Sequence, residues 1–171
     1  KYHNALSQNE IHNLAILVVE VKTGKVLTYI GNSPCRHEQQ GGAVDVIRAS
    51  RSTGSTLKPF LFASALDQGL IVPASILADV PTRIAGYAPK NFDKVYHGAV
   101  RADNALTRSL NIPAVRLLRN YGLEKFHHQL KKLNFPSINQ GPGHYGLTLI
   151  LGGAEASLWE LVRAYASISA E

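Results

Sequence analysis

Ser55 and Lys58 stand three residues apart in the stretch TGSTLKPF, which runs from Thr53 to Phe60. Residues at positions i and i+3 share one face of a helix, so the two side chains are expected to stand within hydrogen-bonding reach. A serine in the first turn of a helix is a candidate nucleophile, because unpaired N–H groups and the helix dipole favour developing negative charge there. Its hydroxyl would need a base, and the amine of Lys58 is the nearest candidate.

Lys58 can act as that base only in its neutral form. At the ordinary pKa near 10.4, only about one lysine in 2,500 is neutral at pH 7. Lowering the pKa by about three units destabilises the ammonium by roughly 4 kcal/mol, which burial against the segment PFLFASAL or a second cation could supply. The structural alternative is a serine at a helix N-terminus followed by a lysine whose stem covers apolar surface.

The elements expected to carry this pair begin with a β-hairpin. The apolar runs 14–21 and 26–31 flank a turn that contains Gly24, and this pattern is typical of two antiparallel strands. A long loop is expected over 31–52, and apolar residues at helical spacing predict a helix from Ser55 to about Leu70.

Helices dominate the rest of the chain, after an extended, irregular segment over 71–98 that is rich in proline and glycine. The pattern predicts helices at about 100–109, 113–121 and 123–133, a loop at 139–146 and an apolar run of open type at 147–153. A last helix opens with Ser157 and Glu160 at the spacing of a capping box. Strands followed by helices indicate an α+β fold. Since a hairpin is marginal alone, the strands that complete its sheet are expected beyond Glu171.

The composition narrows the class of protein. The chain has 171 residues, 45% of them apolar, and a formal net charge of +6, so it can bury a core and weakly favours anionic partners. The basic residues are scattered, and those of RLLRNYGLEKFHHQLKKL are expected on polar helix faces, so we predict no nucleic-acid partner. The single cysteine, Cys35, excludes a disulfide within the chain. The histidines lack metal-ligand spacing, and no apolar run reaches the 18 residues of a membrane span.

The text around Ser55 resembles a known family. RSTGSTLKPFLFASALDQG is similar to the active-site helix of penicillin-binding protein transpeptidases, in which Ser-x-x-Lys carries the acylated serine and its lysine partner. VVEVKTGKVLTYIG resembles the first hairpin of that domain, and YGLTLILGGAEASLWELVRAYA resembles its later helical region. Over most of the chain the likeness is to the class A, bifunctional enzymes. It implies that residues 1–171 are the N-terminal part of a single, incomplete transpeptidase domain.

The second motif of the family, Ser-x-Asn, occurs three times, at Ser7, Ser109 and Ser137. The context ALTRSLNIPAV resembles that of the family, so Ser109 and Asn111 are the candidates. The resemblance implies that Ser109 relays a proton to the leaving amine and that Asn111 binds the substrate backbone and Lys58. Without the family context, an ordinary helix cap before Pro113 is the preferred interpretation.

The third motif, Lys-Thr-Gly, occurs only at Lys22, Thr23 and Gly24. In the family this motif follows the other two on a sheet strand, whereas here it precedes Ser55. We interpret it as a hairpin turn in which Gly24 takes a positive φ. The chain is therefore expected to be truncated before the true motif. It should be nearly inert alone, because losing even one oxyanion donor costs roughly 10²–10³ in rate.

The resemblance implies a D,D-transpeptidase of peptidoglycan synthesis. Ser55 would attack the penultimate D-Ala carbonyl of a stem peptide, terminal D-Ala would leave, and an amine of a neighbouring strand would take the acyl group. β-Lactams would acylate Ser55 in the same way. No cofactor and no metal are expected. The parent protein is expected in the periplasm, anchored in the bacterial inner membrane by a segment outside this chain.

Three other functions remain open. A serine β-lactamase shares Ser-x-x-Lys but needs a carboxylate that activates a deacylating water. No acidic residue is an obvious choice for this role, and Asp103 and Glu124 stay open. A penicillin-sensing or peptidoglycan-binding module would keep the fold without turnover. A nucleic-acid-binding module would require a salt-sensitive affinity for DNA.

Overall fold

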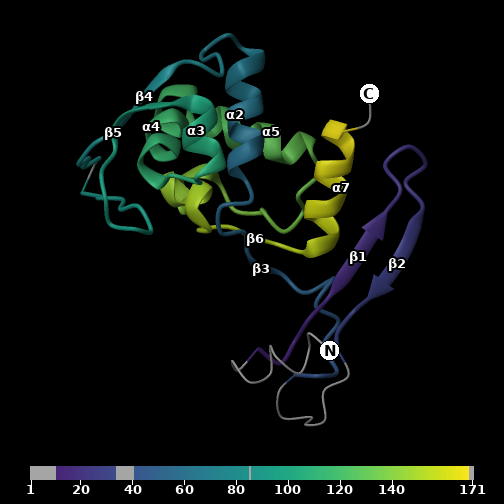
Figure 1. Cartoon of the computed structure of the whole chain (residues 1–171). Coiled ribbons are helices and arrows are strands. Elements are labelled where there is room, and N and C mark those ends of the chain that lie inside the picture. The colour runs from purple at the N-terminus through teal and green to yellow at the C-terminus, as the bar shows by residue number, and fades with distance from the viewer. Residues whose placement is uncertain (1–10, 34–40, 85, 170–171) are drawn as a thin grey trace. The chain divides into compact units, whose positions relative to one another are not determined.

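The structure is a computed structural model that describes residues 11–33, 41–84 and 86–169 (Figure 1). Cys35 and the Ser-x-Asn match at Ser7 lie outside the described residues. The chain divides into two compact units. The first unit comprises residues 1–51, 132–139 and 155–171, and the second comprises residues 52–131 and 140–154.

The predicted hairpin forms part of the first unit. Strands β1 (Ile16–Val19) and β2 (Val26–Ile30) pair antiparallel, with Ile16 opposite Ile30. Gly24 has a φ of 70° in the connecting turn, a conformation that glycine adopts without steric cost. This confirms the interpretation of Lys22, Thr23 and Gly24 as turn residues.

Helix α7 (Leu158–Ser169) packs against β1 in the same unit. Its predicted capping box is confirmed, because the backbone N–H of Glu160 donates to the hydroxyl of Ser157 at 3.2 Å. In return, the backbone N–H of Ser157 donates to the Glu160 carboxylate at 2.6 Å. Among the described residues of this unit, the buried apolar ones are Ile47, Phe135, Ile138, Ala156 and Ala164.

The second unit is mostly helical, and α4 lies at its centre. Helix α4 packs against α2, α3, the strand β4 and the 3₁₀ helix η2, and Figure 1 shows α2 and α3 beside it. The core residues are apolar side chains from these elements, among them Leu61, Ile112, Val115, Leu118 and Leu149. The helices of this part of the chain are α2 (Lys58–Asp67), α3 (Ala102–Thr107), α4 (Asn111–Tyr121), α5 (Leu123–Lys132), α6 (Pro142–Tyr145) and η2 (Gly146–Leu151).

Two strands lie where the sequence predicted an irregular segment and the start of a helix. Strand β4 (Ile76–Asp79) pairs antiparallel with β5 (Gly98–Arg101), and Leu77 lies opposite Val100. The prolines and glycines mark only the connection between these strands, not the whole of 71–98. Likewise the predicted loop at 139–146 contains the short helix α6, which has a proline in its first turn.

The helix expected from Ser55 begins three residues later, at Lys58. Thr56 N–H donates to the carbonyl of Thr53, and Lys58 N–H donates to the carbonyl of Ser55. These i to i+3 hydrogen bonds form a tight turn ahead of the regular helix, and this turn contains Gly54, whose φ is 53°. Ser55 therefore lies in the turn that leads into α2.

The architecture confirms the predicted α+β class, with a hairpin first and mostly helices afterwards. The two-residue strands β3 (Arg51–Ser52) and β6 (Glu155–Ala156) lie where the chain passes between the units. Within the described residues, no helix combines the length and the apolar character that a bilayer crossing requires.

Candidate active site

The turn that carries Ser55 is held by a close approach of two glycines. Gly152 has a φ of 97°, and a Cβ added there would lie 2.9 Å from the Cα of Gly54. Ser52 links the same two segments, because its hydroxyl donates a hydrogen bond to the carbonyl of Gly152 at 2.8 Å. Only glycine allows this approach at position 152, so η2 and the residues after it fix the backbone on which Ser55 stands.

Ser55 itself is half-buried. The helix that follows it has no side-chain cap on its N-cap residue, Leu57. The positive end of α2 is therefore directed toward the turn that carries the hydroxyl. This is the electrostatic environment that a developing alkoxide or oxyanion requires.

Lys58 is buried, with 1% of its surface exposed. Its Nζ donates to the carbonyl oxygen of Ser109 at 2.7 Å and to the side-chain oxygen of Asn111 at 2.7 Å. A third contact, to the hydroxyl of Ser109, is 3.2 Å long. The structure thus brings the lysine of the first motif together with both residues of the second.

Burial lowers the pKa of Lys58 from 10.5 to about 8. Desolvation is the cause, because the ammonium loses more than the amine on leaving water. At a pKa of about 8, roughly one Lys58 side chain in ten is neutral at pH 7. The sequence identified burial or a second cation as possible causes of such a shift, and burial supplies it here.

The hydrogen-bond partners can serve both the ammonium and the neutral amine of Lys58. A neutral amine has two N–H groups and one lone pair, and a carbonyl oxygen and an amide oxygen can only accept. Ser109 and Asn111 therefore engage both N–H groups of the neutral form. The lone pair is then left to accept a proton from a hydroxyl, either that of Ser109 or that of an approaching nucleophile.

The hydrogen bond expected between Ser55 and Lys58 does not form. Among the described residues, the side-chain hydrogen bonds of Lys58 go to Ser109 and Asn111. Ser55 lies in the turn before α2, where its carbonyl accepts the backbone N–H of Lys58, while the Nζ of Lys58 donates to Ser109 and Asn111. Catalytic hydrogen bonds are often long or poorly aligned in the absence of substrate and tighten when it binds.

Ser109 lies in the turn between α3 and α4, where its φ is 53°. This conformation is uncommon for a residue with a side chain, and it directs the carbonyl of Ser109 toward Lys58. The other described Ser-x-Asn match, at Ser137, belongs to the first unit, where its hydroxyl contacts that of Ser50 at 3.2 Å. The contacts with Lys58 within the second unit single out the match at Ser109.

Sequence reasoning missed two buried polar residues beside this cluster, Asp79 and Asn91. Asn91 accepts the backbone N–H of Asn111 at 2.9 Å through its side-chain oxygen. Asp79 is fully buried and accepts both from Asn91 and from His97. The signal that could have found Asp79 is an acidic residue closing the apolar run ILA of β4, since an isolated carboxylate is rarely buried without partners.

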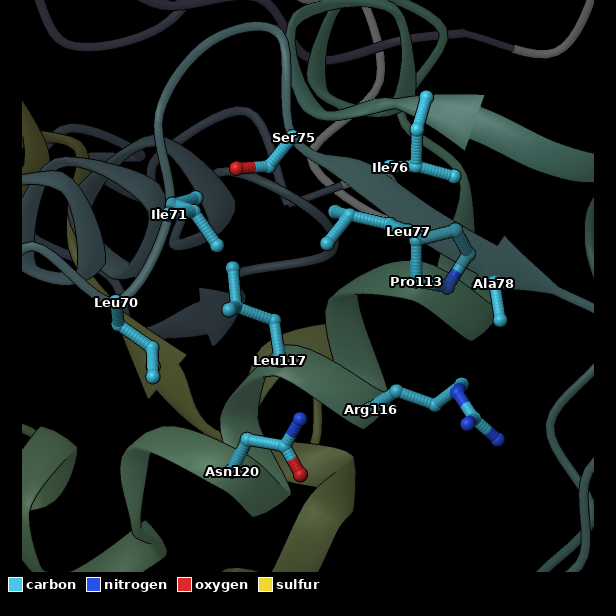
Figure 2. A pocket seen from close by; sticks show the side chains of 10 residues that line it. All are labelled: Leu70, Ile71, Ser75, Ile76, Leu77, Ala78, Pro113, Arg116, Leu117 and Asn120. Carbon is cyan, nitrogen blue, oxygen red and sulfur yellow. The ribbon is translucent and has the colours of Figure 1, made fainter.

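A separate cavity of about 440 Å³ lies between β4 and α4 (Figure 2). Leu117 of α4 points into it from one side, and Leu77 of β4 from the other. None of the four candidate site residues lines it. The cavity is therefore distinct from the Ser55–Lys58 site.

The carboxylates considered for a β-lactamase are engaged or exposed. Asp103 pairs with Arg101 at 2.6 Å, and Glu124 is exposed on α5. Neither shares a hydrogen bond with Lys58, Ser109 or Asn111 in the part of the chain that the structure describes.

Comparisons with known proteins identify the family. Residues 14–170 match the family model of the penicillin-binding protein transpeptidase domain. Penicillin-binding protein 1C of Escherichia coli (strain K12) is 41% identical over 157 residues, in an alignment that covers 92% of this chain and 20% of that protein. The resemblance to the class A penicillin-binding proteins is thereby confirmed, and penicillin-binding protein 1C is the relative that the sequence led us to expect.

Solved structures show the same fold. Penicillin-Binding Protein 1A from Haemophilus influenzae superimposes with a TM-score of 0.75 at 27% identity, covering 90% of this chain and 23% of that one. PonA1 from Mycobacterium tuberculosis, solved in complex with penicillin V, superimposes with a TM-score of 0.77 at 20% identity, covering 97% of this chain and 47% of that one. The chain spans about a fifth of the length of the curated relatives it matches. With its buried Ser-x-x-Lys lysine held by a Ser-x-Asn turn, the chain belongs to the penicillin-binding protein transpeptidase domain family.

Proposed function

We propose that the protein is a serine D,D-transpeptidase of peptidoglycan synthesis and that Ser55 is its nucleophile. The Ser55 oxygen attacks the penultimate D-Ala carbonyl of a stem peptide, and its proton passes to the neutral amine of Lys58. The proton then passes to the leaving D-Ala nitrogen, with the Ser109 hydroxyl as the relay. An amine of a neighbouring stem peptide attacks the acyl-enzyme and restores Ser55.

The buried amine of Lys58 is the observation that supports this proposal most. The ammonium of a surface lysine is hydrated by water, and the neutral fraction of such a lysine at pH 7 is negligible. Here the amine is buried, its pKa is lowered to about 8, and both N–H groups of its neutral form have partners. These are the properties of a proton acceptor beside a serine.

Residues 1–171 form, in this proposal, the N-terminal part of one transpeptidase domain. The family match over 14–170 includes residues of both compact units. The whole protein would work in the periplasm, anchored in the inner membrane by a segment outside this chain. The 171-residue chain has no Lys-Thr-Gly after Asn111, so we expect it to react with β-lactams far more slowly than the full-length protein.

The test is covalent labelling with penicillin V, the β-lactam seen in the PonA1 complex. Full-length wild-type protein should gain one acyl adduct, which peptide mass spectrometry should place on Ser55. The Ser55→Ala variant should gain none, while Thr56→Ala, a matched hydroxyl deletion next to it, should keep the adduct. An adduct that persists in Ser55→Ala would refute the assignment.

The fate of the adduct separates the alternatives. A transpeptidase should transfer the acyl group of a D-Ala-D-Ala peptide to an added amine. It should release the penicilloyl group far more slowly than it turns over that peptide. Rapid hydrolysis of the penicilloyl group would indicate a serine β-lactamase. A stable adduct without transfer to any amine would indicate a sensing module.

A further inference from the structure

We infer that Asp79 and Asn91 are positioning residues that hold the Ser109–Asn111 turn against Lys58. Both belong to the second unit, on strand β4 and on the connection between β4 and β5. Neither is a catalytic residue, because their contacts reach Lys58 only through Asn111. The inference rests on the proposed function for its chemical meaning, and its geometry stands independently.

Asn91 caps helix α4 from a distant part of the chain. The N-cap residue Leu110 provides no side-chain cap. The side-chain oxygen of Asn91 instead accepts the N–H of Asn111 at 2.9 Å and lies 3.4 Å from the N–H of Ile112. These are N–H groups of the first helical turn, which have no partner within the helix. The side-chain oxygen of Asn91 thus holds the start of α4, including Asn111, the residue that binds Lys58.

The backbone next to Asn91 orients the side chain of Asn111. The carbonyl oxygen of Lys90 accepts the side-chain N–H of Asn111 at 2.8 Å. A carbonyl can only accept, so the amide nitrogen of Asn111 must face Lys90 and its oxygen must face Lys58. Residues 90 and 91 therefore determine which end of the amide the lysine meets.

Asp79 fixes Asn91 in turn. The side-chain nitrogen of Asn91 donates to the two carboxylate oxygens of Asp79 at 2.8 and 2.9 Å, and to the carbonyl of Val95 at 2.9 Å. Asp79 has 0% of its surface exposed and Asn91 has 4%. Because the buried carboxylate of Asp79 binds the amide nitrogen of Asn91, the amide has one favourable orientation. In that orientation its oxygen faces α4.

His97 completes the set of partners of Asp79. Its backbone N–H and its Nδ1 lie 2.9 and 2.7 Å from one carboxylate oxygen of Asp79. Its Nε2 lies 2.6 Å from a guanidinium nitrogen of Arg108, which can only donate. The imidazole proton therefore sits on Nδ1 and is donated to Asp79. Asp93 also faces Nε2, at 3.4 Å.

The experiment measures acylation of the full-length protein by penicillin V in matched variants. Asn91→Ala removes the cap of α4 and should slow acylation about 10- to 100-fold, as small misplacements of reacting groups do. Leu117→Ala is the control, because it removes buried volume from the same helix at the wall of the separate cavity (Figure 2). It should lower stability and leave the acylation rate within about threefold of wild type, because it touches none of the polar contacts described above.

A charge exchange distinguishes positioning from a general structural role. Asn91→Asp alone places two carboxylates side by side and should slow acylation strongly. The double variant Asn91→Asp with Asp79→Asn again has one carboxylate and one amide, with their positions exchanged. It should recover at least part of the acylation rate that Asn91→Asp loses. Because the negative charge now lies next to Asn111, the pH midpoint of acylation should move upward from that of wild type.

Hydrogen exchange gives a readout that needs no acylation. In Asn91→Ala the amides of Asn111 and Ile112 should exchange faster than in Leu117→Ala. An acylation rate in Asn91→Ala equal to that of Leu117→Ala, or an exchanged pair with an unmoved pH midpoint, would overturn the inference while Ser55 labelling still supported the function. Absence of Ser55 labelling in wild type would instead overturn the function and leave the exchange result to decide the positioning.

Discussion

The amine of Lys58 lies 2.7 Å from the side-chain oxygen of Asn111, which is 53 residues further along the chain. One residue is the first of α2 and the other is the first of α4. Two helix N-termini thus converge on one buried amine, and each brings its positive end close to the group. Desolvation at this buried contact lowers the pKa of Lys58, so the arrangement suits a base.

The acylation rate should follow the neutral fraction of Lys58. Its folded pKa of about 8 lies below the ordinary 10.5. Below pH 8 the rate should therefore rise about tenfold per pH unit and level off above it. The measurement is the second-order rate constant for penicillin V labelling of the full-length protein between pH 6 and pH 9.5.

The control for this profile is the stability of the protein and of the β-lactam over the same range. A rate that is flat from pH 6 to pH 9 would contradict the role of Lys58 as the base, and an inflection below pH 6.5 would point to a different titrating group. Lys58→Met should lower the rate about 10²- to 10⁴-fold, the usual contribution of a general base.

The Gly152→Ala variant should loosen the turn that carries Ser55. The new Cβ would meet the hydroxyl of Ser52 at 2.6 Å and the backbone of Gly54 at 2.9 Å, at a φ of 97° that side chains rarely adopt. We expect a loss of about 1–3 kcal/mol, as for other overpacked or strained positions. Hydrogen exchange of a peptide over residues 53–61 measures it.

A matched control is Gly143→Ala, since a Cβ there would meet no atom within 4 Å. Exchange in residues 53–61 that is equal in the two variants would show that the contact between Gly152 and Gly54 does not hold the turn. Penicillin V labelling of Gly152→Ala should also be slower than that of Gly143→Ala.

Local patterns predicted most of the elements and the first site residues. Apolar runs around Gly24 gave the hairpin, and Ser157 with Glu160 gave the start of α7, because each pattern is satisfied by residues close in the chain. Lys58 was expected to need burial, and it is buried. The position of Ser109 and Asn111 beside it depends on the packing of α2 against α4, which no local pattern encodes.

The strands β4 and β5 were not predicted, because the proline- and glycine-rich connection between them made the whole segment look irregular in the sequence. Only four residues of each strand take part, and Asp79 ends one of them. The role of Asn91 could not be predicted either, since it lies in an irregular segment and caps a helix that begins 20 residues later. Such contacts over long sequence separations fix the site, and they become evident only when the chain is folded.

The Ser157→Ala variant should destabilise the start of α7. The hydroxyl of Ser157 accepts the backbone N–H of Glu160 at 3.2 Å, and removing an N-cap of this kind costs about 1 kcal/mol. Amides of the first turn of α7 should exchange about fivefold faster. Ser167→Ala, near the other end of the helix, is the control, and equal exchange in both variants would count against the cap.

Asp79 should make the second unit sensitive to acid. Desolvation alone would raise the pKa of Asp79, but the hydrogen bonds from Asn91 and His97 outweigh it and hold this pKa below the ordinary 3.8. A carboxyl whose pKa is lower in the folded state stabilises the fold above the unfolded pKa. That stability is lost as the pH falls from about 4 through the folded value. Between pH 5 and pH 7 the contribution should be constant.

The measurement compares wild type with Asp79→Asn by hydrogen exchange at the start of α4, from pH 6 down to pH 3, after correction for the intrinsic exchange rate. The protection of wild type should exceed that of the variant at pH 6, and the difference should shrink below pH 4. Asp103→Asn is the matched control, because the side chain of Asp103 is 40% exposed and pairs with Arg101 outside the buried set. A difference between wild type and Asp79→Asn that stays the same at pH 3 and pH 6 would mean that the buried carboxylate gains nothing from Asn91 and His97 in its charged form.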